Sequence, residues 1–199
     1  MVNAHGRRFV DEGADFRNYT YAKYGRVILE QPDQMAWQIF DAKVTHLLRD
    51  EYRIKRVTKV SASTLEGLAD KLEGVDRQGF LDELNSYNAA VNTDTAFGPN
   101  IKDGRATQGL SIPKSNWANT IDEGPFEAYQ VGCGITFTFG GLRIDPATAQ
   151  VLDQGHDPIP GLYAAGELVG GVFYFNYPGG TGLINGAVFG RIAGTNALQ

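Results

Sequence analysis

A glycine-rich stretch near the C-terminal end has the clearest potential for chemistry. An apolar strand expected at residues 161–165 runs directly into Gly166 and Glu167, and a helix is expected from about Thr181. Glycines recur every four residues along that helix: Gly182, Gly186, Gly190 and Gly194. Each glycine costs a helix about 1 kcal/mol relative to alanine, so this stripe favours close approach of another backbone. Glycine amides before a helix N-terminus also form a site for negative charge, whereas the plainer interpretation is a tightly packed core helix.

A second reactive segment lies near the start of the chain. It brings cations and phenols together over a short distance: Arg17, Tyr19, Tyr21, Lys23 and Arg26. Several cations in a confined space suit a ligand with two or three carboxylates. The alternative is a solvated loop whose aromatic rings anchor it to the core. Residues 11–26 show no clean period, so we expect a loop that passes into a short helix at residues 22–31.

Composition excludes several classes of partner and site. The net charge of −5 argues against nucleic acid, although the first 60 residues are mildly basic, which suits a small anionic substrate. Cys133 is the single cysteine, so no internal disulfide forms, and a cytoplasmic location is expected. Three isolated histidines and one cysteine show no ligand spacing, so no metal site is expected. No apolar run is long enough to predict a membrane span.

The elements that would position these residues follow from local patterns. We expect a hairpin at residues 2–10, strands at 35–40, 56–61, 126–131 and 135–139, and a helix at 42–52. A capping box beginning at Ser63 opens one helix, and Asp76 caps a second, amphipathic helix. Residues 92–124 are too long for a simple connection, so they are expected to line or cover something.

Three separated motifs carry a resemblance to a known family. Residues 158–194 contain PIPGLYAAGE, NYPGGTGL and GAVFGRIAG. They resemble the C-terminal flavin-binding segment of the fumarate reductase/succinate dehydrogenase flavoprotein superfamily, and more narrowly the FAD-dependent tricarballylate dehydrogenases. Residues 3–26, 113–118 (PKSNWA) and 134–142 (GITFTFGGL) are similar to further segments of that family.

The resemblance implies an α+β fold with two parts. Residues 1–136 would form a cap domain that closes over the substrate, and residues 137–199 would form the C-terminal strand–helix segment of a Rossmann-like FAD-binding domain. The implied activity is dehydrogenation of a small polycarboxylate, of the tricarballylate to cis-aconitate type, by hydride transfer to FAD. The chain contains no G-x-G-x-x-G fingerprint, so we expect a C-terminal fragment that lacks the dinucleotide-binding unit.

The resemblance also assigns roles to individual residues. The candidate catalytic residues are Glu12, Arg17, Tyr19, Tyr21 and Tyr177. The candidate substrate-binding residues are Arg26, Lys114 and Thr136. The candidate cofactor-binding residues are Gly166, Glu167, Asn176, Gly179, Gly180, Thr181, Gly182 and Leu183. Glu12 and Arg17 would form either a proton relay or a surface ion pair. Tyr177 would act as a base only if a nearby cation stabilised its phenolate.

The sequence departs from the family's fumarate reductases at three places. Thr136 to Gly141 stands where they have two histidines, Tyr177 replaces a substrate arginine, and Thr45 lies near the position of another arginine. A tricarballylate-type dehydrogenase is therefore favoured. The alternatives are another superfamily enzyme with a fumarate, urocanate or ketosteroid-like substrate, or an inactive folded module. The expected partners are a membrane-associated electron acceptor and, for the fragment alone, a second copy of itself.

Overall fold

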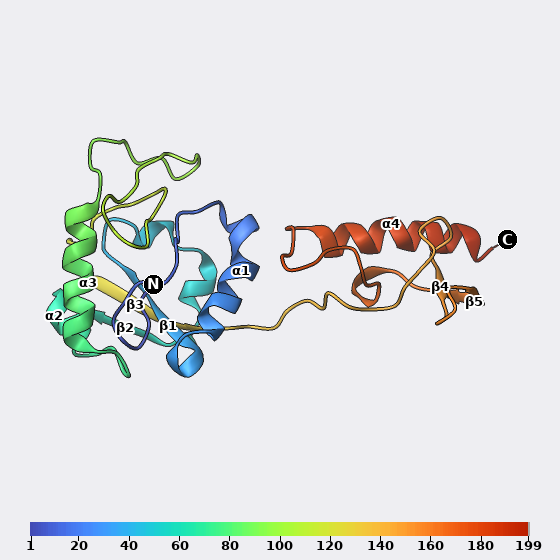
Figure 1. The fold of residues 1–199 in the computed structure, drawn as a ribbon, viewed down its shortest axis with the longest axis horizontal. Coiled ribbons are helices and arrows are strands. Elements are labelled where there is room, and N and C mark those ends of the chain that lie inside the picture. The colour runs from blue at the N-terminus through green and yellow to red at the C-terminus, as the bar shows by residue number, and fades with distance from the viewer. Residues whose placement is uncertain (199) are drawn as a thin grey trace. The chain divides into compact units, whose positions relative to one another are not determined.

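The computed structural model describes residues 1–198, which divide into two compact units (Figure 1). Unit 1 contains Met1–Thr20 and Tyr24–Cys133, and unit 2 contains Tyr21–Lys23 and the residues from Gly134 onward. The division falls between Cys133 and Gly134, slightly before the boundary expected at residue 137. Thr136, expected in the first domain, therefore belongs to the second unit.

Unit 1 is built on a three-stranded antiparallel sheet. Its helices and strands are α1 (Arg17–Leu29), β1 (Met35–Phe40), β2 (Lys59–Ala62), α2 (Leu65–Ala69), α3 (Arg77–Ala90) and β3 (Phe126–Gly132). The strand order is β1-β3-β2, so β3 lies in the middle and pairs with both neighbours. In this register Trp37 lies opposite Gln130, and Val60 lies opposite Ala128. Both helices and strands are thus present, and the expected mixed α and β fold is confirmed.

The core of unit 1 forms where α2 and α3 pack on this sheet. Trp37, Leu68 and Phe80 are at most 2% exposed, and Ala128 of the central strand is fully buried beside them. α3 begins where the sequence predicts, and α2 begins one residue later than a cap at Ser63 would place it. The Asp76 carboxylate accepts a hydrogen bond from the Gln78 amide at the start of α3. At α2 the cap is Thr64, which accepts from the Gly67 amide at 3.1 Å.

Several expected elements of unit 1 are wrong. Residues 42–52 form two short 3-10 turns, η2 (Thr45–Leu47) and η3 (Asp50–Arg53), because no apolar face of this segment is buried. The expected hairpin at residues 2–10 is reduced to one bridge between Val2 and Trp37. α1 begins at Arg17, earlier than expected, directly after Phe16, whose ring lies 5.3 Å from that of Trp117. Tertiary packing here outweighs local propensity.

Residues 92–124 contain no helix or strand, as their polar composition suggests. They are held by their own contacts. Arg105 donates to the carbonyl of Ala118 at 2.8 Å, and the indole of Trp117 donates to the carbonyls of Gly98 and Ile101. The segment is therefore a loop that is held in place by hydrogen bonds from side chains to backbone carbonyls.

Unit 2 has less regular structure. It contains β4 (Gln150–Leu152), β5 (Pro158–Tyr163), the 3-10 turn η4 (Gly166–Leu168) and α4 (Thr181–Asn196), and β4 pairs with β5 antiparallel. A small core of Val151, Ala164 and Val169 joins the hairpin to the turn. The strand expected at residues 135–139 is irregular, whereas α4 begins at the predicted residue. Within the described residues, no helix is long and apolar enough to cross a membrane.

Candidate functional site

The N-terminus of α4 is an open cluster of backbone donors. Gly180 precedes the helix with φ of 90°, a left-handed conformation that favours glycine, and as a glycine it has no side chain to cap the helix. The Thr181 amide donates to the Pro178 carbonyl, and the Gly182 amide donates to the Tyr177 hydroxyl at 2.9 Å. Within residues 1–198, the amides of Gly180 and Leu183 have no hydrogen-bond partner. Of the four expected cofactor-binding residues at this helix start, Thr181 and Gly182 therefore have amides already engaged within the chain.

The glycine stripe of α4 has two distinct halves. A Cβ at Gly182 would lie 3.1 Å from the Tyr177 hydroxyl oxygen, and a Cβ at Gly186 would lie 3.8 Å from the Cα of Gly166. The Asn185 side-chain amide also donates to the Gly166 carbonyl, which ties the helix to the turn after β5. A Cβ at Gly190 or Gly194 would meet nothing within 4 Å. The first half of the stripe is thus approached by the Tyr177 side chain at Gly182 and by the Gly166 backbone at Gly186, whereas the second half is open.

The turn between β5 and α4 carries the remaining expected cofactor residues. Gly166 has φ of 77°, and Glu167 follows it on η4 with its carboxylate exposed. That carboxylate accepts a hydrogen bond from the Thr138 amide at 3.2 Å, which fixes its position. Asn176 accepts from the Tyr177 amide through its side-chain oxygen, and Gly179 is exposed at the surface.

Tyr177 is the most enclosed of the expected catalytic residues. It is only 6% exposed, and its ring stacks on Phe137 with centroids 4.1 Å apart and planes 13° apart. Its oxygen accepts from the Gly182 amide and so lies at the positive end of α4. This contact fixes the phenol oxygen of Tyr177 at the start of α4. Thr136 is exposed in the irregular strand-free segment.

The basic and aromatic residues of the first segment lie on different faces of α1. Arg17 and Tyr21 are four positions apart on one face, whereas Tyr19 and Arg26 share another, because residues two positions apart point about 200° apart in a helix. Arg17 is 56% exposed and lies 3.9 Å from Glu51, and Arg26 pairs with Glu30. The expectation that these side chains converge on one ligand is therefore wrong.

Glu12 has different partners from those expected. Its carboxylate bonds to Arg8 at 2.7 Å and to the ammonium group of Met1, and it does not pair with Arg17. Burial by itself would raise the pKa of Glu12. The ammonium of Met1, the hydrogen bond from Arg8 and the charge of Lys114 outweigh burial and lower the pKa to about 2. The Glu12–Arg17 relay is thus corrected to a Glu12–Arg8 ion pair.

Lys114 lies beside this pair and forms no ion pair within the described chain. Burial lowers the pKa of its ammonium group, and the nearby Glu12 carboxylate offsets this only in part. Its backbone is held by mutual hydrogen bonds with Thr107. Lys114 is therefore a positioned cation with capacity for a carboxylate.

Two residues of this region were missed by sequence reasoning. Arg8 has a side chain only 6% exposed and donates to the carbonyls of Ile112 and Pro113, and Tyr24 donates to the carbonyl of Asp11. Burial raises the pKa of Tyr24 to about 12. No periodic signal marks Arg8, because two of the carbonyls that hold it, those of Ile112 and Pro113, lie about a hundred positions away in the sequence.

Comparison with known proteins defines the class. The model of the family described as "FAD binding domain" matches residues 1–183, so the chain belongs to this family, and FAD is confirmed as the indicated cofactor. Its relatives place it, within that class, in the fumarate reductase/succinate dehydrogenase flavoprotein superfamily.

The matches cover this chain fully and the relatives only partly. A probable fumarate reductase of Shewanella frigidimarina is 38% identical over 100% of this chain and 31% of its own length. An NADH:fumarate oxidoreductase of Klebsiella pneumoniae is 36% identical over 100% of this chain and 20% of its own length. The open conformation of a flavocytochrome c3 fumarate reductase superposes with a TM-score of 0.72 at 33% identity, covering 98% of this chain and 31% of that one. The chain therefore spans about a third or less of these relatives.

The residues present fit the flavin part of FAD. Two unpaired amides at the start of a sixteen-residue helix can donate to the acceptor edge of a flavin, and no acidic residue stands in the first turn of α4 to repel it. Glu167 offers an exposed carboxylate for a hydroxyl group. A Cβ at Gly171 or Gly180 would meet nothing, so ligand atoms can approach the backbone there. Among residues 1–198, no cluster of His, Cys, Asp or Glu side chains could hold a metal ion.

Proposed function

We propose that the chain is the C-terminal part of an FAD-dependent oxidoreductase that dehydrogenates a small polycarboxylate, of the tricarballylate to cis-aconitate type. Bound FAD would accept the hydride removed from the substrate. The proposal rests above all on Tyr177, whose buried phenol oxygen accepts a hydrogen bond from the first turn of α4. Hydride transfer to FAD leaves one substrate proton to be removed, and the Tyr177 oxygen, which this contact fixes in place, would act as the base that accepts it.

The other residues would bind and orient. Gly180 and Leu183 would donate to the flavin edge where negative charge develops, and Glu167 would accept from a cofactor hydroxyl. Lys114 would hold one substrate carboxylate, because it is a partly buried cation without an ion pair of its own in the described chain. Thr136 would add a hydroxyl contact. Each of four residues remains an individual candidate: Arg17, Tyr19, Tyr21 and Arg26. They would not all contact one ligand, because α1 directs them to different faces.

Fumarate reduction is the second candidate. It is favoured by the 38% identity to the probable fumarate reductase of Shewanella frigidimarina. Against it stands Tyr177, which replaces an arginine expected to hold a substrate carboxylate. The two candidates differ in direction, because dehydrogenation needs a base and reduction needs a proton donor.

Turnover separates the two candidates. The chain is produced together with any residues encoded in frame before it, and two reactions are measured: tricarballylate-dependent reduction of a dye, and fumarate-dependent oxidation of a reduced dye. We expect the first reaction. Tyr177→Phe lowers its kcat by about 100-fold or more while flavin content is unchanged. Tyr174→Phe is the matched control, because Tyr174 is 70% exposed in the same loop. Equal loss in both variants, or turnover with fumarate alone, contradicts the proposal.

The affinity of the isolated 199-residue chain for FAD tests whether the FAD site is shared between this chain and a separate dinucleotide-binding unit. The described residues offer contacts to the flavin end, and no G-x-G-x-x-G turn for the diphosphate. Association costs at least about 4 kcal/mol of entropy, so we expect a dissociation constant in the millimolar range or weaker and a colourless protein. A yellow preparation with one flavin per chain would overturn this division of the site.

A further inference from the structure

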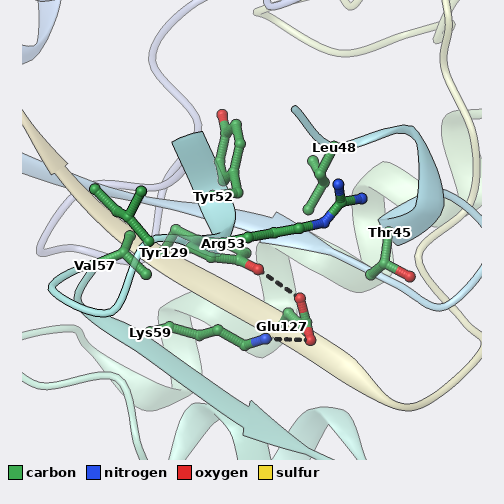
Figure 2. A pocket seen from close by; sticks show the side chains of 9 residues that line it. Thr45, Leu48, Tyr52, Arg53, Val57, Lys59, Glu127 and Tyr129 are labelled. Carbon is green, nitrogen blue, oxygen red and sulfur yellow. Dashed lines mark hydrogen bonds and ion pairs between the residues drawn. The ribbon is translucent and has the colours of Figure 1, made fainter. Parts of the chain in front are cut away.

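Unit 1 contains a pocket that takes no part in the proposed flavin chemistry. It has a volume of about 400 Å³, which falls in the range of small-molecule sites. The lining residues come from η2, η3, β2 and β3 and the turns between them: Thr45, Leu48, Tyr52, Arg53, Ile54, Val57, Lys59, Glu127 and Tyr129. Figure 2 shows eight of these side chains labelled around the pocket.

One side of this pocket is aromatic and apolar. The rings of Tyr52 and Tyr129 meet edge to face, with centroids 4.9 Å apart and planes at 86°. Tyr52 is fixed by a hydrogen bond from its hydroxyl to Gln38 at 2.7 Å, and Leu48 and Val57 extend the apolar wall. The rings are therefore held in place before any ligand arrives, which reduces the entropic cost of binding.

The charged side chains at the other side of the pocket differ in how fully they are paired with one another. Glu127 accepts from Lys59 at 2.5 Å through one oxygen and from the Tyr129 hydroxyl at 2.6 Å through the other, so these three groups satisfy one another. Figure 2 shows both contacts as dashed lines. Lys59 and Glu127 together add no net charge. A ligand would gain little by competing with this closed set.

Arg53 is the remaining cation of the pocket. In Figure 2 its side chain extends across the pocket and its guanidinium lies on the side of Thr45 and Leu48. Its ion pair with Asp50, at 2.8 Å, joins residues three positions apart, and Asp50 is 96% exposed. Such an exposed pair is weak and screened by salt, so a ligand carboxylate can replace it. The guanidinium can then bind that carboxylate with two parallel hydrogen bonds.

We infer that this pocket binds a small monocarboxylate whose apolar or aromatic body lies against Tyr52, Leu48 and Val57 and whose carboxylate pairs with Arg53. One available cation selects a single carboxylate, so the ligand class differs from the polycarboxylate of the proposed reaction. All the lining residues belong to unit 1, so the inference does not depend on flavin or on the proposed function.

The test is an NMR titration of the full 199-residue chain with benzoate, benzamide and tricarballylate, monitored at the Ile54 methyl groups and the Tyr52 and Tyr129 rings. Benzoate is expected to shift these signals in a saturable way. Benzamide has the same shape without the charge. Its affinity is expected to be lower by about tenfold or more, because it loses a charge-assisted contact. Tricarballylate is expected to bind no better than benzoate.

Two variants complete the test. Arg53→Gln is expected to lower the affinity for benzoate by about tenfold. Arg56→Gln removes the same charge from the same exposed segment, does not line the pocket, and is expected to leave the affinity unchanged. Unchanged backbone spectra show that both variants are folded. The inference is overturned if benzoate shifts no pocket signal, if benzamide binds equally well, or if the two variants lose affinity alike.

Discussion

Unit 1 and unit 2 differ in how completely each one buries its own side chains. Unit 1 encloses Trp37 and Phe80 almost fully, and even its buried charges, Arg8 and Glu12, are paired inside it. Unit 2 leaves large apolar side chains in solvent: Leu183 is 82% exposed and Phe175 is 74% exposed. Most of the chain's folding free energy therefore resides in unit 1, while unit 2 leaves more of its large apolar side chains uncovered.

The prediction with the largest expected effect on this contrast concerns an aromatic side chain in the core of unit 1. Phe80→Ala is expected to lower the free energy of unfolding by about 3–5 kcal/mol, because Phe80 is fully buried between α3 and the sheet. Both tryptophans, Trp37 and Trp117, lie in unit 1, so denaturant unfolding followed by their fluorescence reports this unit alone. Phe175→Ala in unit 2 is the control and is expected to leave the transition unchanged. Equal losses in both variants would erase the contrast.

The second test concerns the buried ion pair of unit 1. The pKa of Glu12 is about 2 in the folded chain against an ordinary 4.5, so its ionised form stabilises the fold above pH 4.5. This contribution, about 3 kcal/mol, is lost as the pH falls from 4.5 toward 2. Glu12→Gln should flatten the dependence of unfolding free energy on pH in that window. Glu66→Gln, at an exposed position, should not.

Part of this effect depends on the free ammonium of Met1. A version of the chain with residues added before Met1 should therefore show a smaller loss across the same pH window. If acetylating the amino group changes nothing, the pairing of Met1 with Glu12 makes no contribution to stability.

The smallest test compares the two halves of the glycine stripe in unit 2. Gly190→Ala is expected to stabilise α4 by about 0.5–1 kcal/mol, because a Cβ there meets nothing and alanine favours helix. Gly182→Ala should gain less or nothing, since its Cβ would crowd the Tyr177 hydroxyl at 3.1 Å. Amide hydrogen exchange along α4 measures both. Equal protection from hydrogen exchange in the two variants would mean that the Tyr177 side chain moves away from a Cβ at position 182 at little energetic cost.

Elements with a strong local signal were predicted well from the sequence. The cap at Asp76, the apolar strand β1 and the start of α4 depend on neighbouring residues, and the structure has all three. The expected helix at residues 42–52 failed because Val44, Leu47 and Leu48 match a helical period but find no surface to cover. A period predicts a helix only when the fold buries that face.

The residues of the candidate site also differ in whether their positions depend on neighbouring or on distant parts of the sequence. Residues 166–183 form one continuous segment, so the prediction that Gly180 and Glu167 bind cofactor depends on local sequence alone. The surroundings of Glu12 depend on Arg8 and Lys114, and the second is about a hundred residues away. The family resemblance suggested Arg17 as a partner, yet α1 directs Arg17 toward Glu51. Contacts between distant segments carry no local signal, so sequence reasoning missed them.

The position of β3 in the sheet has a consequence for synthesis on the ribosome. β1 and β2 do not pair with each other, since each pairs only with β3, which is the last strand of unit 1 to be translated. The sheet can close only after Gly132 has left the exit tunnel, at elongation rates of about 5–20 residues per second. Until then the nascent chain presents two unpaired strands, which are open to pairing with other chains. Chaperone capture during translation should therefore be strongest before β3 emerges.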